Sequence, residues 1–243
     1  MIVLFTDFGT SDPYLGQVKA VLQRAAPRTP VVDALNDAPD FAIKSGAHLL
    51  AALAPRYPRG SVFLTVVDPG VGGPRDAIVV QADGRRFVGP DNGLLSVLWR
   101  RAKRSRCRRI VWRPAFLSIT FHGRDLFAPV AAALARGRMP AGWLAAPCAP
   151  RVLLDADDLA QVIYVDHYGN AMTGLRAASI APGARLRAGG RALAPARTFG
   201  AARLGTAFWY ENSLGLVEIA ANRASAARKL GLRVGSHVAI SRR

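Results

Sequence analysis

A loop in the N-terminal half holds one carboxylate and one guanidinium close together. Asp68 follows an apolar run and Arg75 ends the loop, while Pro69 and Pro74 restrict the backbone and three glycines keep side chains out of it. Such a pair could orient a water molecule and accept its proton. No Lys-Ser/Thr follows, so a nucleoside triphosphate loop is disfavoured, and a purely structural Asp–Arg pair is the alternative.

Two further clusters could contact a small molecule. Asp7 directly follows the first apolar run and could accept two hydrogen bonds from a ribose diol, while Gly9 lets the backbone approach a ligand. His122 lies beside glycine and charge just before a predicted helix, a reactive setting for an imidazole. A capped turn and a structural histidine are the alternatives. Because open α/β sheets place their sites where strands end, these clusters are site candidates.

Three weaker clusters combine amides, hydroxyls or carboxylates with glycine. Gly89–Gly93 is more typical of a turn and helix cap than of a ligand contact. In the C-terminal half, Asp166–Asn170 and Tyr210–Gly215 could each contribute polar contacts. None of the three indicates a function by itself.

The elements that must position the first clusters alternate β-rich runs with amphipathic segments, which is typical of an α/β domain. We predict a central, mostly parallel sheet with strands at Ile2–Phe5, Val31–Asp33, Ser61–Val67, Ala77–Gln81 and Arg109–Trp112. We predict helices at Tyr14–Ala25, Phe41–Ala54, Leu94–Arg101 and Leu126–Arg136.

The second half shows short β runs separated by glycine and proline, which predicts a smaller antiparallel, β-barrel-like domain. Its predicted strands are Gln161–Val165, Arg185–Ala188, Ala207–Tyr210, Gly215–Ile219 and His237–Ile240. Gly, Ala and Pro cluster between the two patterns. We therefore expect an N-terminal domain over residues 1–148, a linker over 149–158 and a C-terminal domain over 159–243.

The chain carries 33 basic and 16 acidic residues, a formal net charge of +17. Its densest basic run, Arg100–Arg109, could contact phosphate groups. No aromatic residue interleaves to stack bases, and no recognition helix or zinc finger accompanies the run. Nucleic acid is therefore a disfavoured partner, and a solvated surface is the alternative.

Other features argue against several classes of protein. No apolar run reaches the roughly 18 residues of a membrane span, and the first residues are typical of a strand rather than a signal peptide. Cys107 and Cys148 lie far apart in the sequence and in no metal-binding spacing, which favours two reduced thiols. We expect a soluble, cytoplasmic protein without a metal ion or other cofactor.

Taken in order, these clusters resemble the S-adenosylmethionine hydrolase (adenosine-forming) family, which is related to fluorinating and chlorinating enzymes. The resemblance covers nearly the whole chain, from Thr6–Gly9 through Val67–Gly72 and Phe121–Asp125 to Asn222–Ala224. It implies S-adenosylmethionine as the substrate and a homotrimer, in which the substrate lies between one subunit's N-terminal domain and its neighbour's C-terminal domain.

The resemblance also assigns residues. Asp68, Arg75 and His122 match the catalytic triad of the hydrolases. Asp166 and Ser213 match contacts to the amino-acid end of the substrate. The full set of implied substrate-binding residues is Asp7, Asp12, Phe41, Phe121, Asp166, Tyr168, Asn170, Asn212, Ser213 and Arg223.

Five of these residues take further particular roles by resemblance. Asp7 falls where the family binds the ribose hydroxyls, and Asp12 falls near the methionine amine. Phe41 occupies a position that is aromatic in relatives and packs on the nucleoside. Asn170 and the backbone around Arg223 match adenine contacts.

Three positions depart from the family pattern. Asn36 stands where a histidine is expected, Met172–Gly174 replaces a Thr-Asn pair, and Ala224 stands where hydrolases often have glycine. These departures affect substrate contacts and leave the triad intact.

The triad fits a simple mechanism. The sulfonium is already a good leaving group, so the task is to aim a desolvated water at the ribose 5′ carbon opposite the carbon–sulfur bond. Arg75 would favour hydroxide character in that water, and either Asp68 or His122 would accept its proton. The alternatives are a chlorinase-like halogenase, a non-catalytic nucleoside-binding protein, and a basic nucleic-acid-binding module.

Overall fold

The computed structural model describes residues 1–181 and 183–241 and divides the chain into two compact units. The first unit contains residues 1–50 and 57–156, and the second contains residues 51–56 and the chain from Asp157 onward. Within the described residues, no helix is long and apolar enough to cross a bilayer.

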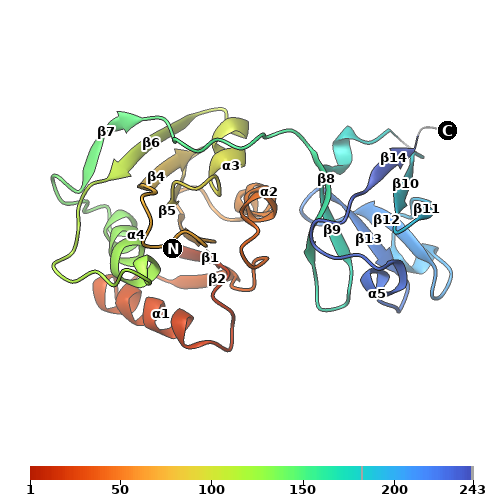
Figure 1. The fold of residues 1–243 in the computed structure, drawn as a ribbon, viewed down its shortest axis with the longest axis horizontal. Helices are drawn as coiled ribbons and strands as arrows, with labels where there is room; N and C mark the ends of the chain where they lie inside the picture. The colour runs from red at the N-terminus through yellow and green to blue at the C-terminus, as the bar shows by residue number, and fades with distance from the viewer. Residues whose placement is uncertain (182, 242–243) are drawn as a thin grey trace. The chain divides into compact units, whose positions relative to one another are not determined.

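The first unit is built on a seven-stranded mixed sheet with the strand order β2-β1-β3-β5-β4-β6-β7 (Figure 1). Neighbours among β2, β1, β3 and β5 are parallel, and β4, β6 and β7 join antiparallel. The strands are β1 Ile2–Thr6, β2 Val31–Leu35, β3 Val62–Val66, β4 Ala77–Ala82, β5 Arg85–Pro90, β6 Ser105–Ile110 and β7 Leu144–Cys148. The prediction of an α/β unit with a mostly parallel core is confirmed.

Helices cover both faces of this sheet. They are α1 Pro13–Ala25, α2 Ile43–Leu53, α3 Ser96–Arg101 and α4 Ala128–Ala135, with a short π-helical turn, η2 Gly123–Phe127, before α4 and a 3-10 turn, η1 Ala54–Arg56, after α2. Side chains alternate along β1, so Ile2 and Leu4 join the core cluster formed with α1 and α4. Phe5 lies on the opposite face, near Gly46 of α2.

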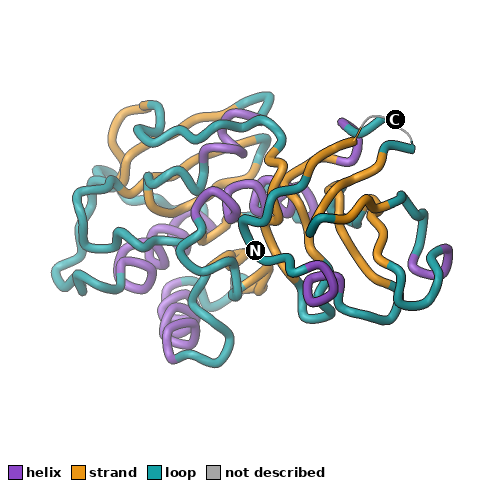
Figure 2. The backbone as a smooth tube through the Cα atoms, turned by 45° about the vertical axis from the view of Figure 1, so that its right-hand side comes forward, coloured by secondary structure: helices purple, strands orange, loops and turns teal. Residues whose placement is uncertain are grey.

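The second unit consists mainly of strands and loops (Figure 2), and its named strands pair antiparallel. One sheet has the order β12-β13-β9-β8 and the other β11-β10-β14. Its elements are β8 Leu159–Val165, β9 Ala171–Arg176, η3 Ala177–Ser179, β10 Arg185–Ala188, β11 Arg191–Leu193, η4 Phe199–Ala201, β12 Ala207–Glu211, β13 Leu216–Ala221, α5 Ala226–Leu230 and β14 Ala239–Ser241. The predicted antiparallel character is confirmed.

The sequence misplaced the sixth strand. The predicted strand Arg109–Trp112 overlaps β6 only at its first two residues. In the structure β6 begins at Ser105, inside the basic run, and ends at Ile110. Its side chains alternate, with Cys107 buried and Arg106 exposed, and the strand pairs with β4. Pairing with a neighbouring strand therefore outweighs the charge of this segment.

Other boundaries also differ. Gly89 and Pro90, predicted as part of a turn, end β5 instead, where they pair with β4. Phe41 does not begin a helix: its φ is 58°, a left-handed conformation, and α2 starts at Ile43. His237 forms only an isolated bridge, so the last strand starts later than predicted. Strands β5, β7, β9 and β11 had not been predicted as strands.

Candidate active site

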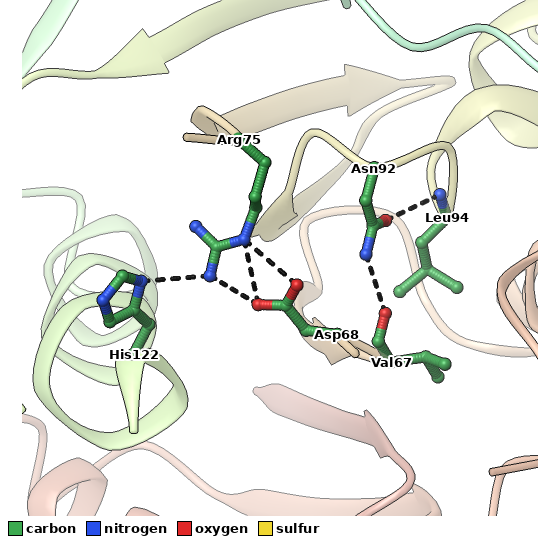
Figure 3. Close-up of polar contacts among 6 residues, drawn as sticks. All are labelled: Val67, Asp68, Arg75, Asn92, Leu94 and His122. Carbon is green, nitrogen blue, oxygen red and sulfur yellow. Dashed lines mark hydrogen bonds and ion pairs between the residues drawn. The ribbon is translucent and has the colours of Figure 1, made fainter. Parts of the chain in front are cut away.

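The loop between β3 and β4 holds Asp68 and Arg75 in a buried ion pair (Figure 3). Arg75 Nε donates to both carboxylate oxygens at 3.0 Å, and Arg75 Nη2 also donates to Oδ2. The side chains of Arg75 and Asp68 are only 11% and 3% exposed. Charge-assisted bonds of this kind hold both groups in fixed positions.

His122 joins the pair through the same guanidinium. Arg75 Nη2 lies 3.0 Å from His122 Nδ1 (Figure 3). A guanidinium can only donate, so Nδ1 must accept and the ring proton must lie on Nε2. Burial and the charge of Arg75 lower the pKa of His122, although Asp68 opposes the shift. The imidazole is therefore neutral at neutral pH and presents an N–H at Nε2.

A glycine brings the two loops of this site together. Gly72 has a φ of +80°, which favours glycine, and a Cβ there would lie 2.6 Å from the carbonyl oxygen of Ile119. The Asp68–Arg75 loop therefore packs directly against the segment that precedes His122. This contact explains how residues far apart in the sequence meet.

Asn92 fixes the end of β3, where Asp68 begins the loop. Its Nδ2 donates to the Val67 carbonyl at 2.8 Å, and its Oδ1 accepts from the Leu94 N–H at 3.1 Å (Figure 3). Asn92 therefore forms a local turn with Leu94 and not the predicted helix cap, because the N-cap of α3 is Leu95, which makes no side-chain cap hydrogen bond. The same side chain holds the residue before Asp68 in place. This positioning contact was not predicted, although the run Asp91-Asn92-Gly93 was a signal for a turn.

Asp7 directly follows β1, the strand next to β3, and lies in an acidic environment. Burial, followed by the charges of Asp40 and Asp68, raises the pKa of Asp7 to about 6, although backbone hydrogen bonds at Asp7 and Phe41 oppose the rise. Its backbone N–H donates to the Val66 carbonyl at 3.1 Å. The carboxylates of Asp7 and Asp68 thus interact electrostatically where β1 and β3 end.

An aromatic group lies beside the start of the His122 turn. Phe121 contacts Phe8 and Tyr14 edge-on, with ring centroids 5.7 and 5.5 Å apart. Phe8 and Phe121 also pack against the core, so they can form an apolar wall. Within residues 1–181 and 183–241, no side-chain hydrogen bond or ring contact joins Asp12 or Phe41 to the triad. Phe41 is 74% exposed.

The predicted polar residues of the C-terminal half gather in the second unit. They line a pocket of about 780 Å³, whose walls include Asp166, Tyr168, Asn170, Asn212, Ser213 and Arg223. Asp166 accepts from the Asn170 backbone at 2.8 Å and from Asn170 Nδ2 at 2.9 Å. Two clusters that were weak signals in the sequence therefore share one cavity.

Glu218 also lines this pocket, although it was not predicted as a site residue. It is 2% exposed and accepts hydrogen bonds from the Tyr210 hydroxyl and from Asn212 Nδ2, the latter at 2.8 Å. Burial raises the pKa of Glu218, although both hydrogen bonds oppose the shift. The available signal was an acidic residue within the otherwise apolar strand Leu216–Ala221.

Two departures from the family pattern have structural explanations. Asn36 is buried and accepts a hydrogen bond from Thr6 Oγ1 at 3.1 Å, so it supports the end of β1. A Cβ at Gly174 would lie 2.6 Å from Leu159 Cβ, so a small residue lets β9 approach β8. Ala224, the third departure, lines the C-terminal pocket.

The two cysteines lie close together, and the acidic residues form no metal site among the described residues. Cys107 and Cys148 are both free thiols, and their Sγ atoms lie 3.9 Å apart across β6 and β7. In the part of the chain that the structure describes, no cluster of three His, Cys, Asp or Glu residues could hold a metal ion.

Comparison with known proteins identifies the class. Residues 2–143 match the SAM hydroxide adenosyltransferase N-terminal domain, and residues 160–239 match the C-terminal domain of the same family. The chain belongs to this family.

Individual relatives agree with this assignment. The (R)-S-adenosyl-L-methionine hydrolase of Thermus thermophilus is 40% identical over 98% of both chains. A fluorinase of Actinopolyspora mzabensis is 24% identical over 100% of this chain and 97% of its own. The crystal structure of an uncharacterized conserved protein from Thermotoga maritima superposes with a TM-score of 0.89 at 31% identity, covering 100% of both chains.

Proposed function

We propose that the chain hydrolyses S-adenosylmethionine to adenosine and methionine. The observation that carries this proposal is the buried Asp68–Arg75 ion pair, which is joined to His122 through the same guanidinium. Membership of the SAM hydroxide adenosyltransferase family and the 40% identity to a named hydrolase support it.

In the proposed reaction, water attacks the ribose 5′ carbon in line with the carbon–sulfur bond. The new carbon–oxygen bond forms as the carbon–sulfur bond breaks. The electron pair of the carbon–sulfur bond stays on sulfur, so the sulfonium leaves as the neutral thioether of methionine. No proton is needed at sulfur. The attacking water loses one proton, so the site must accept it.

Asp68 is the proposed proton acceptor. His122 Nδ1 already accepts a hydrogen bond from Arg75, and its other nitrogen carries a proton, so the ring has no lone pair available in this arrangement. Each carboxylate oxygen of Asp68 retains acceptor capacity beyond its bonds to Arg75. His122 then acts by orienting Arg75, which stabilises hydroxide character in the water.

The remaining predicted contacts are proposed to bind the substrate. In the first unit, Asp7 would accept hydrogen bonds from the ribose diol, and Phe121 would contribute an apolar wall that excludes water. In the second unit, the pocket of about 780 Å³ would hold the adenine and the amino-acid end. By its resemblance to the family, the chain is proposed to form a homotrimer with sites at subunit interfaces.

Product chromatography tests the proposal. The protein is incubated with S-adenosylmethionine, with and without chloride, beside Asp68→Ala. Asp33→Asn is the matched control, because Asp33 is an exposed carboxylate paired with Lys19. We expect adenosine and methionine from wild type and Asp33→Asn, and nearly none from Asp68→Ala, which should still bind substrate. A 5′-chlorinated nucleoside that appears only with chloride would indicate a halogenase instead.

Three finer features belong to the proposal. We expect a trimer by light scattering, cytoplasmic localisation by cell fractionation, and activity that survives chelation of metal ions. The named hydrolase acts on the (R) epimer of the substrate, so we also expect this chain to consume the (R) sulfonium epimer from an epimeric mixture. Loss of activity with a chelator, or consumption of only the other epimer, would contradict the corresponding feature.

A further inference from the structure

A second cavity, the basic pocket, lies in the first unit and is lined by four cations. Arg59, Lys103, Arg104 and Arg106 surround a space of about 970 Å³, together with a single carboxylate, Asp83. None of these residues belongs to the proposed catalytic triad. The pocket therefore concentrates positive charge at a place that the proposed reaction does not use.

Three separate segments of the chain form the basic pocket. Arg59 precedes β3, Asp83 lies in the turn between β4 and β5, and Arg106 lies on β6. In the sheet, Arg106 pairs with Gln81, the exposed residue of β4, so the two side chains stand side by side. A Cβ at Gly84 would lie 2.8 Å from Arg59 Nε, so Arg59 packs directly over this turn.

The one acidic residue of the basic pocket bonds to the backbone of the loop and not to the cationic side chains. Asp83 Oδ1 accepts from the Arg104 backbone N–H at 3.1 Å, and Oδ2 accepts from the Lys103 backbone N–H at 3.3 Å. The Asp83 N–H in turn donates to the Arg104 carbonyl at 3.0 Å. Asp83 therefore shapes the loop that presents Lys103 and Arg104.

Neighbouring arginines have structural partners, but these four cations do not. Arg86 donates to the carbonyls of Leu134 and Gly60, and Arg108 donates to those of Ala145 and Leu144. Over residues 1–181 and 183–241, the side chains lining the basic pocket from Arg59 and from positions 103, 104 and 106 make no hydrogen bond or ion pair. Their donors face the cavity unpaired.

We propose that the basic pocket binds a short chain of phosphate groups. Guanidinium groups donate in a planar fork that matches the oxygens of phosphate, and three arginines converge here. Gln81 and Ser105 add neutral donors. No aromatic side chain lines the pocket within the described residues, so it offers phosphate contacts without a surface for stacking a base.

Calorimetric titration with inorganic tripolyphosphate tests this site. The test variant is Arg104→Glu/Arg106→Glu, in which both changed side chains are exposed. The matched control is Arg187→Glu/Arg191→Glu, which changes the net charge equally at exposed positions of the second unit. Both variants are checked for unchanged thermal unfolding and S-adenosylmethionine turnover, so that loss of phosphate binding is not confused with misfolding.

We expect the test variant to lose at least tenfold in affinity for tripolyphosphate, and the control to lose less than twofold. Because the proposed contacts are ionic and lie at the surface, binding should also weaken as the salt concentration rises from about 50 to 200 mM. Equal losses of affinity in the two variants would show that overall charge causes the effect, and would overturn the proposal. Absence of wild-type binding would also overturn it. Tighter, pocket-dependent binding of single-stranded DNA than of tripolyphosphate would replace it with a nucleic-acid site.

Discussion

Asp7 links the stability of the protein to pH in a direction that a single substitution can test. In the folded state its pKa is raised from an ordinary value of 3.8 to about 6, mainly by burial and then by Asp40 and Asp68. Between these two pKa values the folded state holds the proton more tightly than the unfolded state. The free energy of unfolding should therefore fall as pH rises from about 4 to about 6, and stay lower above that range.

The size of this effect follows from the same pKa values. A rise from 3.8 to about 6 corresponds to about 3 kcal/mol at about 1.4 kcal/mol per pH unit. Asp7 is only partly buried, so solvent screening reduces the cost to about 1–2 kcal/mol. Asp7→Asn removes the charge while keeping the shape. The variant should therefore be more stable than wild type by about that amount at pH 7, and equally stable below pH 4.

Urea unfolding of wild type and Asp7→Asn from about pH 4 to 8 measures the effect. The difference between the two proteins isolates Asp7 from other titrating groups. Asp33→Asn is the control, because its exposed carboxylate should change stability by less than about 1 kcal/mol at any pH. A variant that is less stable than wild type at pH 7, or a difference that does not vary with pH, would refute the reasoning. Turnover should fall in Asp7→Asn because the proposed ribose contact is weakened.

Three further predictions follow from individual contacts. Asn92→Ala should lower the free energy of unfolding by about 1–3 kcal/mol and reduce kcat, because two backbone partners lose their hydrogen bonds; unchanged kcat would refute the positioning role. Gly169→Ala should lower the melting temperature strongly, because its Cβ would lie 2.0 Å from Ser225 Oγ at a φ of +83°, while Gly235→Ala, with open space around its Cβ, should cost much less; equal losses would contradict this packing. Burial raises the pKa of the Cys107 thiol, so mass spectrometry should find it unalkylated by iodoacetamide at pH 8 until the protein unfolds, and early labelling would contradict its burial.

Local patterns in the sequence predicted much of the first unit and of the site. Asp68 and Arg75 share one short loop, so their pairing needed only local geometry. Asp7 was identified because it ends an apolar run, and strand ends meet at one edge of a parallel sheet. His122 could be named by position and resemblance, but its contact with Arg75 depends on the close packing of Gly72 against Ile119.

Features that depend on long-range pairing could not be read from the sequence. The basic run became β6 because β4 and β7 pair with it, and the pairing of β6 with β7 also brought Cys107 and Cys148 together. β5 begins with Arg85 and Arg86, whose charges obscured the strand; in the structure both guanidinium groups donate to backbone carbonyls. Glu218 was missed because its partners, Tyr210 and Asn212, lie on the far side of a turn.

The most direct test of the central claim is hydrolysis in water enriched in oxygen-18, followed by mass spectrometry of both products. Attack of water at the ribose 5′ carbon predicts one heavy oxygen in adenosine, at the 5′ hydroxyl, and none in methionine. Heavy oxygen in homoserine, with 5′-methylthioadenosine as the other product, would place the attack on the amino-acid side of the sulfonium. That result would contradict the arrangement of Asp68, Arg75 and His122 proposed for this protein.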